Sequence, residues 1–265
     1  MDLGQAAVLG LVQGATEFFP VSSSGHLVVV PHLLGWEAPP VSFDVAVHFG
    51  TLLALLAVYW RDLLNMFRVW LPGEDRAQGD VTRALLPLLL LGSVPAAIAG
   101  LAARGFIEAA FGKLSWIAAF LLVSGCLAFG TERLASGLKR LQDVGWKQAL
   151  LVGLAQACAL LPGLSRSGAT MFAGAACGLD RETAPRFAFL LAVPAILGAS
   201  FVKLGEVQGL ASQQLACYAV GTLVAALSGF AAIKLVVAAL RRQSFYVFAS
   251  YCWVVGFVAL WLAQR

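Results

Sequence analysis

Six apolar stretches, each about as long as a membrane-spanning helix, are the feature that most constrains this chain. They cover residues 43–60, 84–103, 114–130, 187–204, 214–235 and 247–263. Roughly 20 helical residues cross a hydrocarbon core of about 30 Å, and the stretches lack the two-residue alternation of an outer-membrane strand. Hydrophobic residues make up 60% of the chain and charged residues 12%. The sequence therefore predicts an all-α integral membrane protein, a polytopic bundle with six transmembrane helices.

The Lys and Arg residues are better interpreted as topology markers than as a binding patch, although the net charge is +4. Thirteen of the 18 fall on one side of the predicted bundle, four fall on the other, and Arg166 lies inside an apolar segment. The richer side holds the expected loops 61–83, 131–147, 180–186 and 236–246. By the positive-inside rule that side is cytoplasmic, so both termini are expected in the periplasm. No nucleic-acid partner is expected.

Two further apolar segments, 3–35 and 147–178, are each interrupted near the middle. The interruptions are Pro20–Gly25 and Pro162–Gly168. Each half is then too short to span, and irregular backbone at membrane depth survives only inside protein or beside a wet cavity. We expect two re-entrant helix-loop-helix segments, with the second half-helix of the first one over residues 26–34.

The interrupted segments resemble each other at an offset of 143 residues. Six identities occur in the sixteen positions 10–25, and the pairs are Gly10 with Gly153, Leu11 with Leu154, Gln13 with Gln156, Ser22 with Ser165, Ser24 with Ser167 and Gly25 with Gly168. Three spans follow each segment, and an odd number of spans inverts the second copy. We expect a single membrane domain, 1–265, made of two inverted-topology repeats, 1–135 and 146–265. Paired interruptions of this kind indicate a site near the midplane.

The first interruption carries an unusual set of polar residues, within GATEFFPVSSSGHLVVVP. Gln13 and Glu17 share one face of the first half-helix, and a carboxylate at this depth needs a partner or a task. Ser22, Ser23 and Ser24 stand where a helix would begin, and free N–H groups there favour anions. Ordinary N-capping explains one of the three hydroxyls.

The three histidines are interpreted differently. The company of Glu17 and the serines favours a functional His26, whereas His32 and His48 are interpreted as packing residues.

The second interruption, PGLSRSGAT, places Arg166 between Ser165 and Ser167. An arginine at membrane depth costs roughly 2.5 to 3.5 kcal/mol on insertion scales, so it needs an anionic partner. Its planar fork suits phosphate oxygens. A salt bridge to Glu17 is the alternative partner, and substrate could displace it. If the two interruptions meet, they form an anion site with acid–base capacity.

Both motifs resemble those of the undecaprenyl pyrophosphate phosphatase family, also called the bacitracin-resistance phosphatases. QGATEFFPVSSSGH matches the first family motif and PGLSRSGAT the second. The resemblance implies a phosphatase of the bacterial inner membrane that converts the polyprenyl diphosphate lipid to its monophosphate and inorganic phosphate. It would recycle the carrier lipid for peptidoglycan synthesis, with the bilayer as its environment. A homodimer is kept as one candidate assembly.

The resemblance also implies roles for individual residues. The catalytic set would be Glu17, Ser23, His26 and Arg166. The substrate-binding residues would be Gln13, Ser22, Ser24, Ser165, Ser167 and Thr170. The family uses a divalent cation, Mg²⁺ or Ca²⁺, with Glu17 as the candidate ligand. Many members carry a second Glu where this chain has Gln13, so we expect the substrate diphosphate to hold part of the cation.

Two classes of function remain open from the residues themselves. Either Ser23 or a water could attack phosphorus, with His26 or Glu17 taking the proton. The opposing class is a polyprenyl-phosphate transporter or flippase, because inverted repeats with broken helices are also a transporter architecture. Release of phosphate without a second compartment separates the two.

Overall fold

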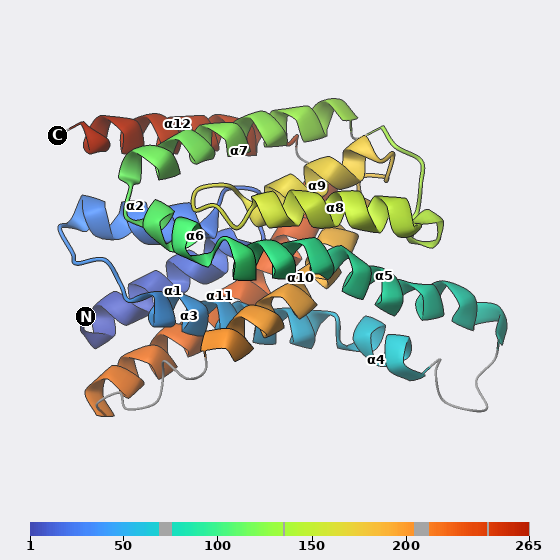
Figure 1. Cartoon of the computed structure of the whole chain (residues 1–265), viewed down its shortest axis with the longest axis horizontal. Coiled ribbons are helices and arrows are strands. Elements are labelled where there is room, and N and C mark those ends of the chain that lie inside the picture. Colours follow the sequence, from blue (N-terminus) through green and yellow to red (C-terminus); the bar gives the residue numbers. More distant parts are fainter. Residues whose placement is uncertain (69–75, 135, 204–211, 243, 265) are drawn as a thin grey trace.

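The structure is a computed structural model that describes residues 1–68, 76–134, 136–203, 212–242 and 244–264. Within these ranges it contains twelve α-helices and a short 3-10 helix, Leu141–Asp143 (Figure 1). The helices are α1 Leu3–Glu17, α2 Ser23–Leu34, α3 Val41–Val58, α4 Trp60–Arg68, α5 Arg76–Ala102, α6 Arg104–Phe111, α7 Leu114–Leu134, α8 Trp146–Cys158, α9 Arg166–Ala176, α10 Thr183–Lys203, α11 Ser212–Arg242 and α12 Tyr246–Ala263.

Six of the described helices are long and apolar enough to cross a membrane. They are α3, α5, α7, α10, α11 and α12. Each coincides with one of the six predicted spans. The first helix, for example, covers Val41–Val58, and the predicted span was 43–60. The prediction of an all-α, multi-pass membrane protein is confirmed.

Two short helices occupy places where the sequence pattern predicted loops. Helix α4 follows α3 directly, inside the segment 61–83, and α6 joins α5 to α7. In α4, Met66 is buried while Arg61 is exposed. Such amphipathic helices suit the membrane surface, and they escape a search for long apolar runs.

The two interrupted segments form the pairs α1–α2 and α8–α9. In Figure 1, α1 and α2 lie toward the end that carries both chain termini, whereas α8 and α9 extend toward the opposite end. The first interruption ends earlier than expected, because α2 begins at Ser23 and not at residue 26. Ser22 is its N-cap, so Ser23 and Ser24 belong to the first helical turn.

The first helix of each pair packs closely on a long helix through glycine. A Cβ atom on Gly10 of α1 would lie 2.4 Å from the carbonyl oxygen of Gly221 in α11, and one on Gly153 of α8 would lie 2.2 Å from that of Gly92 in α5. Membrane helices approach this closely only where side chains are small. The identity of Gly10 and Gly153 at the 143-residue offset thus has a packing reason.

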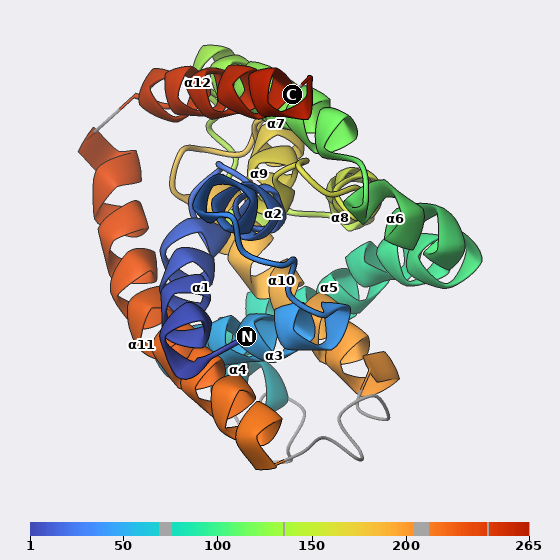
Figure 2. The ribbon, with the colours of Figure 1, turned by 90° about the vertical axis from the view of Figure 1, so that its left-hand side faces the viewer.

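Helices α7 and α12 pack along each other and cover one side of the interruptions. Figure 2 shows α2 and α9 at the centre of the bundle, with α7 and α12 lying across them. Most polar residues of both interruptions are buried, among them Ser22, Ser23, Ser165 and Ser167.

Candidate active site

Ser22 and Ser165 begin the two inner helices in the same way. The Gly25 N–H donates to Ser22 Oγ at 3.2 Å, and the Gly168 N–H donates to Ser165 Oγ at 3.0 Å. Ser22 has a φ of 68°, a left-handed value that is uncommon outside glycine and whose strain typically collects at functional sites. The first turn of any helix also leaves backbone N–H groups without partners inside the helix.

The two interruptions contact each other directly. Ser167 Oγ donates to the carbonyl oxygen of Phe19 at 2.8 Å, and the Gly163 N–H donates to Ser24 Oγ at 3.3 Å. The predicted meeting of the two motifs is therefore present, and Ser24 and Ser167 hold the motifs together.

Ser124, on α7, fixes the second interruption from outside either motif. Its hydroxyl donates to the carbonyl oxygen of Gly163 at 2.9 Å and accepts from the Ser165 N–H at 2.8 Å. The side chain is fully buried. Sequence analysis missed this residue, because a serine in an apolar span ordinarily bonds back to its own helix, as Ser124 also does to Phe120.

Glu17 lies where the two motifs meet, and it is only 6% exposed. Its Oε1 accepts a hydrogen bond from Arg166 Nη2. Its Oε2 accepts from Ser23 Oγ and, at 2.9 Å, from Gln13 Nε2. Ser23 and Arg166 are the first residues of α2 and α9, so equivalent positions in the two segments approach one carboxylate from two sides. The Glu17–Arg166 salt bridge, which the sequence left as the alternative to a phosphate partner, is present.

His48 also faces Glu17, and sequence analysis interpreted it as a packing residue. Its Nε2 lies 3.5 Å from Glu17 Oε2. Its Nδ1–H donates to the carbonyl oxygen of Asp44 at 2.7 Å, which fixes the ring. The packing interpretation of His48 is wrong, as it is for His32, which is exposed at the end of α2. No local pattern marks His48, because it reaches the site from α3.

The accessible side of Glu17 is formed by its two basic neighbours. The Glu17 side chain is 3% exposed, compared with 22% for Arg166 and 29% for His48. Arg166 and His48, two nitrogen-bearing side chains, are therefore the more accessible neighbours of the carboxylate.

His26 is buried in α2, but its contacts lead away from Glu17. Its Nδ1 lies 2.7 Å from the carbonyl oxygen of Ser22, and its Nε2 lies 2.8 Å from the hydroxyl of Tyr251 in α12. The motif places His26 beside the cluster as expected, while both ring nitrogens are engaged elsewhere. Tyr251 is a second residue that sequence analysis missed.

The remaining predicted binding residues serve local structure in this state. Thr170 Oγ1 donates to the carbonyl oxygens of Arg166 at 2.8 Å and Ser167 at 3.2 Å. Ser165 Oγ lies 3.2 Å from Ser167 Oγ. These hydroxyls stabilise the first turn of α9, so they position Arg166 rather than face the carboxylate.

The described residues contain no group of three or more His, Cys, Asp or Glu that could hold a metal ion. Gln13 Nε2 donates to the Glu17 carboxylate, while its Oε1 is buried without a hydrogen-bond partner. Mg²⁺ and Ca²⁺ prefer oxygen ligands, and Mg²⁺ often uses only one or two protein groups together with phosphate oxygens. Gln13 and Glu17 therefore fit a cation that the substrate shares, but not a cage made of protein alone.

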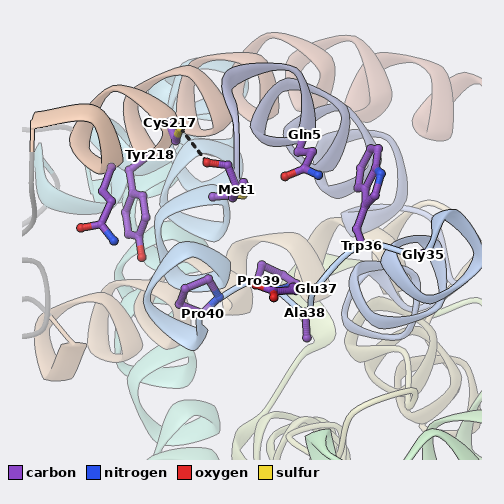
Figure 3. Close-up of a pocket in the computed structure, with 11 residues that line it drawn as sticks. Met1, Gln5, Gly35, Trp36, Glu37, Ala38, Pro39, Pro40, Cys217 and Tyr218 are labelled. Atoms are coloured by element: carbon purple, nitrogen blue, oxygen red, sulfur yellow. Dashed lines mark hydrogen bonds between the residues drawn. The ribbon is translucent and has the colours of Figure 1, made fainter.

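A cavity of about 400 Å³ lies at the N-terminus of the chain. It is separate from the Glu17 cluster, which consists of Glu17 and its contacts Gln13, Ser23, His48 and Arg166. Its walls come from the start of α1, the segment 35–40 and α11, including Gln5, Trp36, Glu37 and Tyr218 (Figure 3). None of the residues that contact Glu17 lines it. The cavity therefore contributes nothing to the candidate site.

Comparisons with known proteins point to one family. The family described as "Bacitracin resistance protein BacA" matches residues 6–258. An undecaprenyl-diphosphatase of Desulfosudis oleivorans is 42% identical over 277 aligned residues, covering all of both chains. Those of Halothermothrix orenii and Syntrophotalea carbinolica are 38% and 42% identical and cover 99% and 97% of both chains. With matches of this length, the chain belongs to the BacA family.

Proposed function

We propose that this membrane protein is an undecaprenyl-diphosphatase whose chemistry takes place at the Glu17 cluster. It hydrolyses undecaprenyl diphosphate to undecaprenyl phosphate and inorganic phosphate. Full-length relatives carry that name. The observation that carries the placement is the convergence of Ser23 and Arg166 on one buried carboxylate. Recycling of the carrier lipid and resistance to bacitracin follow from this activity.

The terminal phosphate binds at Arg166 and the starts of the two inner helices. Arg166 uses Nη2 for Glu17, and a guanidinium has five N–H donors, so further donors remain for phosphate oxygens. The free N–H groups at the first turns of α2 and α9 add partial positive charge. Together they stabilise the negative charge that spreads over the equatorial oxygens during transfer.

Ser23 is the nucleophile and Glu17 is its base. Ser23 Oγ already donates to Glu17 Oε2, which is the contact that a proton transfer needs. Attack of Oγ on the terminal phosphorus forms a phosphoserine and breaks the bond to the bridging oxygen. Undecaprenyl phosphate leaves, and the Ser23 proton passes to Glu17.

Water completes the reaction and restores the enzyme. It attacks the phosphoserine, the Oγ–P bond breaks, and Oγ recovers a proton from Glu17. His26, on the same helix face as Ser23 one turn further on, takes the proton that the water loses at Nε2, the nitrogen bonded to Tyr251. It then releases this proton to solvent, which restores the neutral ring. Inorganic phosphate is the product.

A divalent cation, Mg²⁺ or Ca²⁺, is part of the proposal. It would be held by Glu17, Gln13 Oε1 and the substrate phosphates, where it would neutralise charge on the diphosphate. Support comes from Gln13 Oε1, which is buried and unpartnered in a side chain that contacts Glu17 through Nε2.

Phosphate release by the purified wild-type protein tests this assignment. In detergent, with undecaprenyl diphosphate and no second compartment, we expect release of inorganic phosphate that falls strongly when EDTA is added. Release that EDTA leaves unchanged would contradict the role of the cation. A well-folded protein that releases no phosphate would favour a lipid-phosphate transporter that uses the same anion site.

The architecture that supports this site is a single domain of two inverted repeats, 1–135 and 146–265, each opening with a re-entrant segment, 3–35 and 147–178. Three observations support it. Ser22 and Ser165 cap their helices alike. Gly10 and Gly153 each pack on the long middle helix of the other half. The third spans, α7 and α12, pack together.

We place both termini and the α6 end in the periplasm of a bacterial inner membrane. The two chain termini lie at the same end of the molecule (Figure 1), and 13 of the 18 Lys and Arg residues fall on the side of the predicted topology opposite the termini. In a variant whose native cysteines are replaced, we expect Gly105→Cys to react with an impermeant thiol reagent in intact spheroplasts. Leu138→Cys, which is 89% exposed in the wild type, should react only after lysis. The reverse pattern would contradict this orientation.

A further inference from the structure

His26 is held at both ring nitrogens, and the two partners come from different parts of the chain. The carbonyl oxygen of Ser22 lies 2.7 Å from Nδ1. The hydroxyl of Tyr251, 225 residues away, lies 2.8 Å from Nε2. The ring planes of His26 and Tyr251 are nearly parallel, 4° apart, with centroids separated by 5.6 Å. Contacts at both nitrogens leave the imidazole little freedom to turn.

The chemistry of the two partners assigns the protons. A carbonyl oxygen only accepts hydrogen bonds, so Nδ1 carries a hydrogen. In neutral His26 the lone pair is then on Nε2, and Tyr251 donates its hydroxyl proton to it. The proton positions on the His26 ring are inferred from its hydrogen-bond partners.

A hydroxyl suits both protonation states of His26. When Nε2 gains a proton, the same Tyr251 oxygen accepts the new N–H bond, because a phenol is both donor and acceptor. His26 can therefore take up and release a proton without losing its partner or rotating. A purely apolar neighbour would leave the charged ring without a partner at membrane depth, where unpaired polar groups are costly.

The neighbours of Tyr251 show that α12 holds this part of the site. Cys252 Sγ, the next residue, contacts the carbonyl oxygen of Pro20 at 3.5 Å. Phe248, one turn earlier, packs against Phe19 with ring centroids 5.4 Å apart. Tyr251 itself is 45% exposed, so its ring is not required to fill the core. Its specific contribution is the hydrogen bond to His26.

We propose that Tyr251 is a positioning residue of the hydrolytic site, which holds His26 in one orientation through both of its protonation states. The proposal rests on the function proposed above, in which His26 receives a proton. Tyr251 acts through His26 and does not touch the reacting phosphate.

A double-mutant cycle on phosphate release tests the proposal. Tyr251→Phe removes the hydroxyl and keeps the ring, and we expect kcat to fall about tenfold with KM changed less than about twofold. A tenfold decrease is a fraction of the roughly 10²- to 10⁴-fold rate acceleration that a positioned general acid or base supplies. In a His26→Ala protein, adding Tyr251→Phe should cost less than about twofold, because contacting residues that act as a unit are not additive.

The matched control is Tyr218→Phe. Tyr218 also lies in a long apolar helix, α11, and its hydroxyl lies 2.7 Å from Ser42 Oγ, outside the Glu17 cluster. Its kcat should equal that of the wild type. Thermal melting of all variants in detergent separates loss of fold from loss of function, since the expected drop occurs without a lower melting temperature.

Three outcomes would overturn the proposal. The first is full activity of Tyr251→Phe beside a strongly impaired His26→Ala. The second is a decrease in kcat by the same factor when Tyr251→Phe is added to wild type and to His26→Ala. That result would make Tyr251 an independent structural residue. The third is full activity of His26→Ala. The proposed function is judged separately, because Ser23→Ala and Glu17→Gln report on it whatever Tyr251 does.

Discussion

Arg166→Lys is expected to lower kcat by roughly 10²- to 10³-fold, the cost of losing one preorganised donor to a developing negative charge. Lysine keeps the positive charge but replaces a planar fork with a single ammonium point. Arg166 Nη2 is committed to Glu17, so phosphate must be bound by the other donors of the same group. A lysine cannot serve both partners in that geometry. Phosphate release by purified protein measures the effect.

A second arginine–glutamate pair in the same chain provides the control. Arg181 contacts Glu132 through both terminal nitrogens, at 3.2 and 3.1 Å. Like Glu17 and Arg166, the two residues are far apart in the sequence. Arg181→Lys therefore disturbs a similar pair outside the site, and its kcat should stay within about twofold of the wild type. Near wild-type turnover by Arg166→Lys would remove Arg166 from the mechanism.

The spans were the easiest part of the fold to predict. Length and hydropathy act along the chain, so the helix Tyr246–Ala263 was visible as residues 247–263. Helix α4 was not visible, because its nine residues are amphipathic and held partly by burial of Met66. Short helices of this kind depend on the surface that they cover, which no local pattern reveals.

The start of α2 shows a different limit. Three consecutive serines can each cap a helix, and the prediction began the helix three residues too late. Ser22 takes the cap because the chain turns there with a φ of 68° and its hydroxyl meets the Gly25 N–H. The consequence is functional, since Ser23 then sits in the first turn beside Glu17.

Within the site, residues inside the two motifs could be predicted and residues outside them could not. The Glu17–Arg166 contact was one of the two pairings considered, because an unpaired charge at membrane depth is costly. His48, Ser124 and Tyr251 reach the site from α3, α7 and α12. Each is a polar residue in an apolar span, and only the packing of the helices decides whether such a residue faces a site or its own backbone.

Glu17→Gln is expected to lower kcat by roughly 10²- to 10⁴-fold, the usual range for a lost general base. The amide keeps the shape of the side chain but cannot accept the Ser23 proton. KM should change much less than kcat, because Arg166, freed from its anionic partner, offsets the weaker hold on the shared cation. A fall in kcat without a rise in KM is the signature of a group that acts in the transition state.

The most direct test of the Glu17 cluster compares phosphate release from undecaprenyl diphosphate by wild type, Glu17→Gln and Glu132→Gln. Glu132 is the matched control, because it is also paired with an arginine and accepts a backbone N–H, from Phe245 at 2.6 Å. We predict full release by wild type and Glu132→Gln, and release near background by Glu17→Gln. Wild-type release by Glu17→Gln would contradict the placement of the chemistry at this carboxylate.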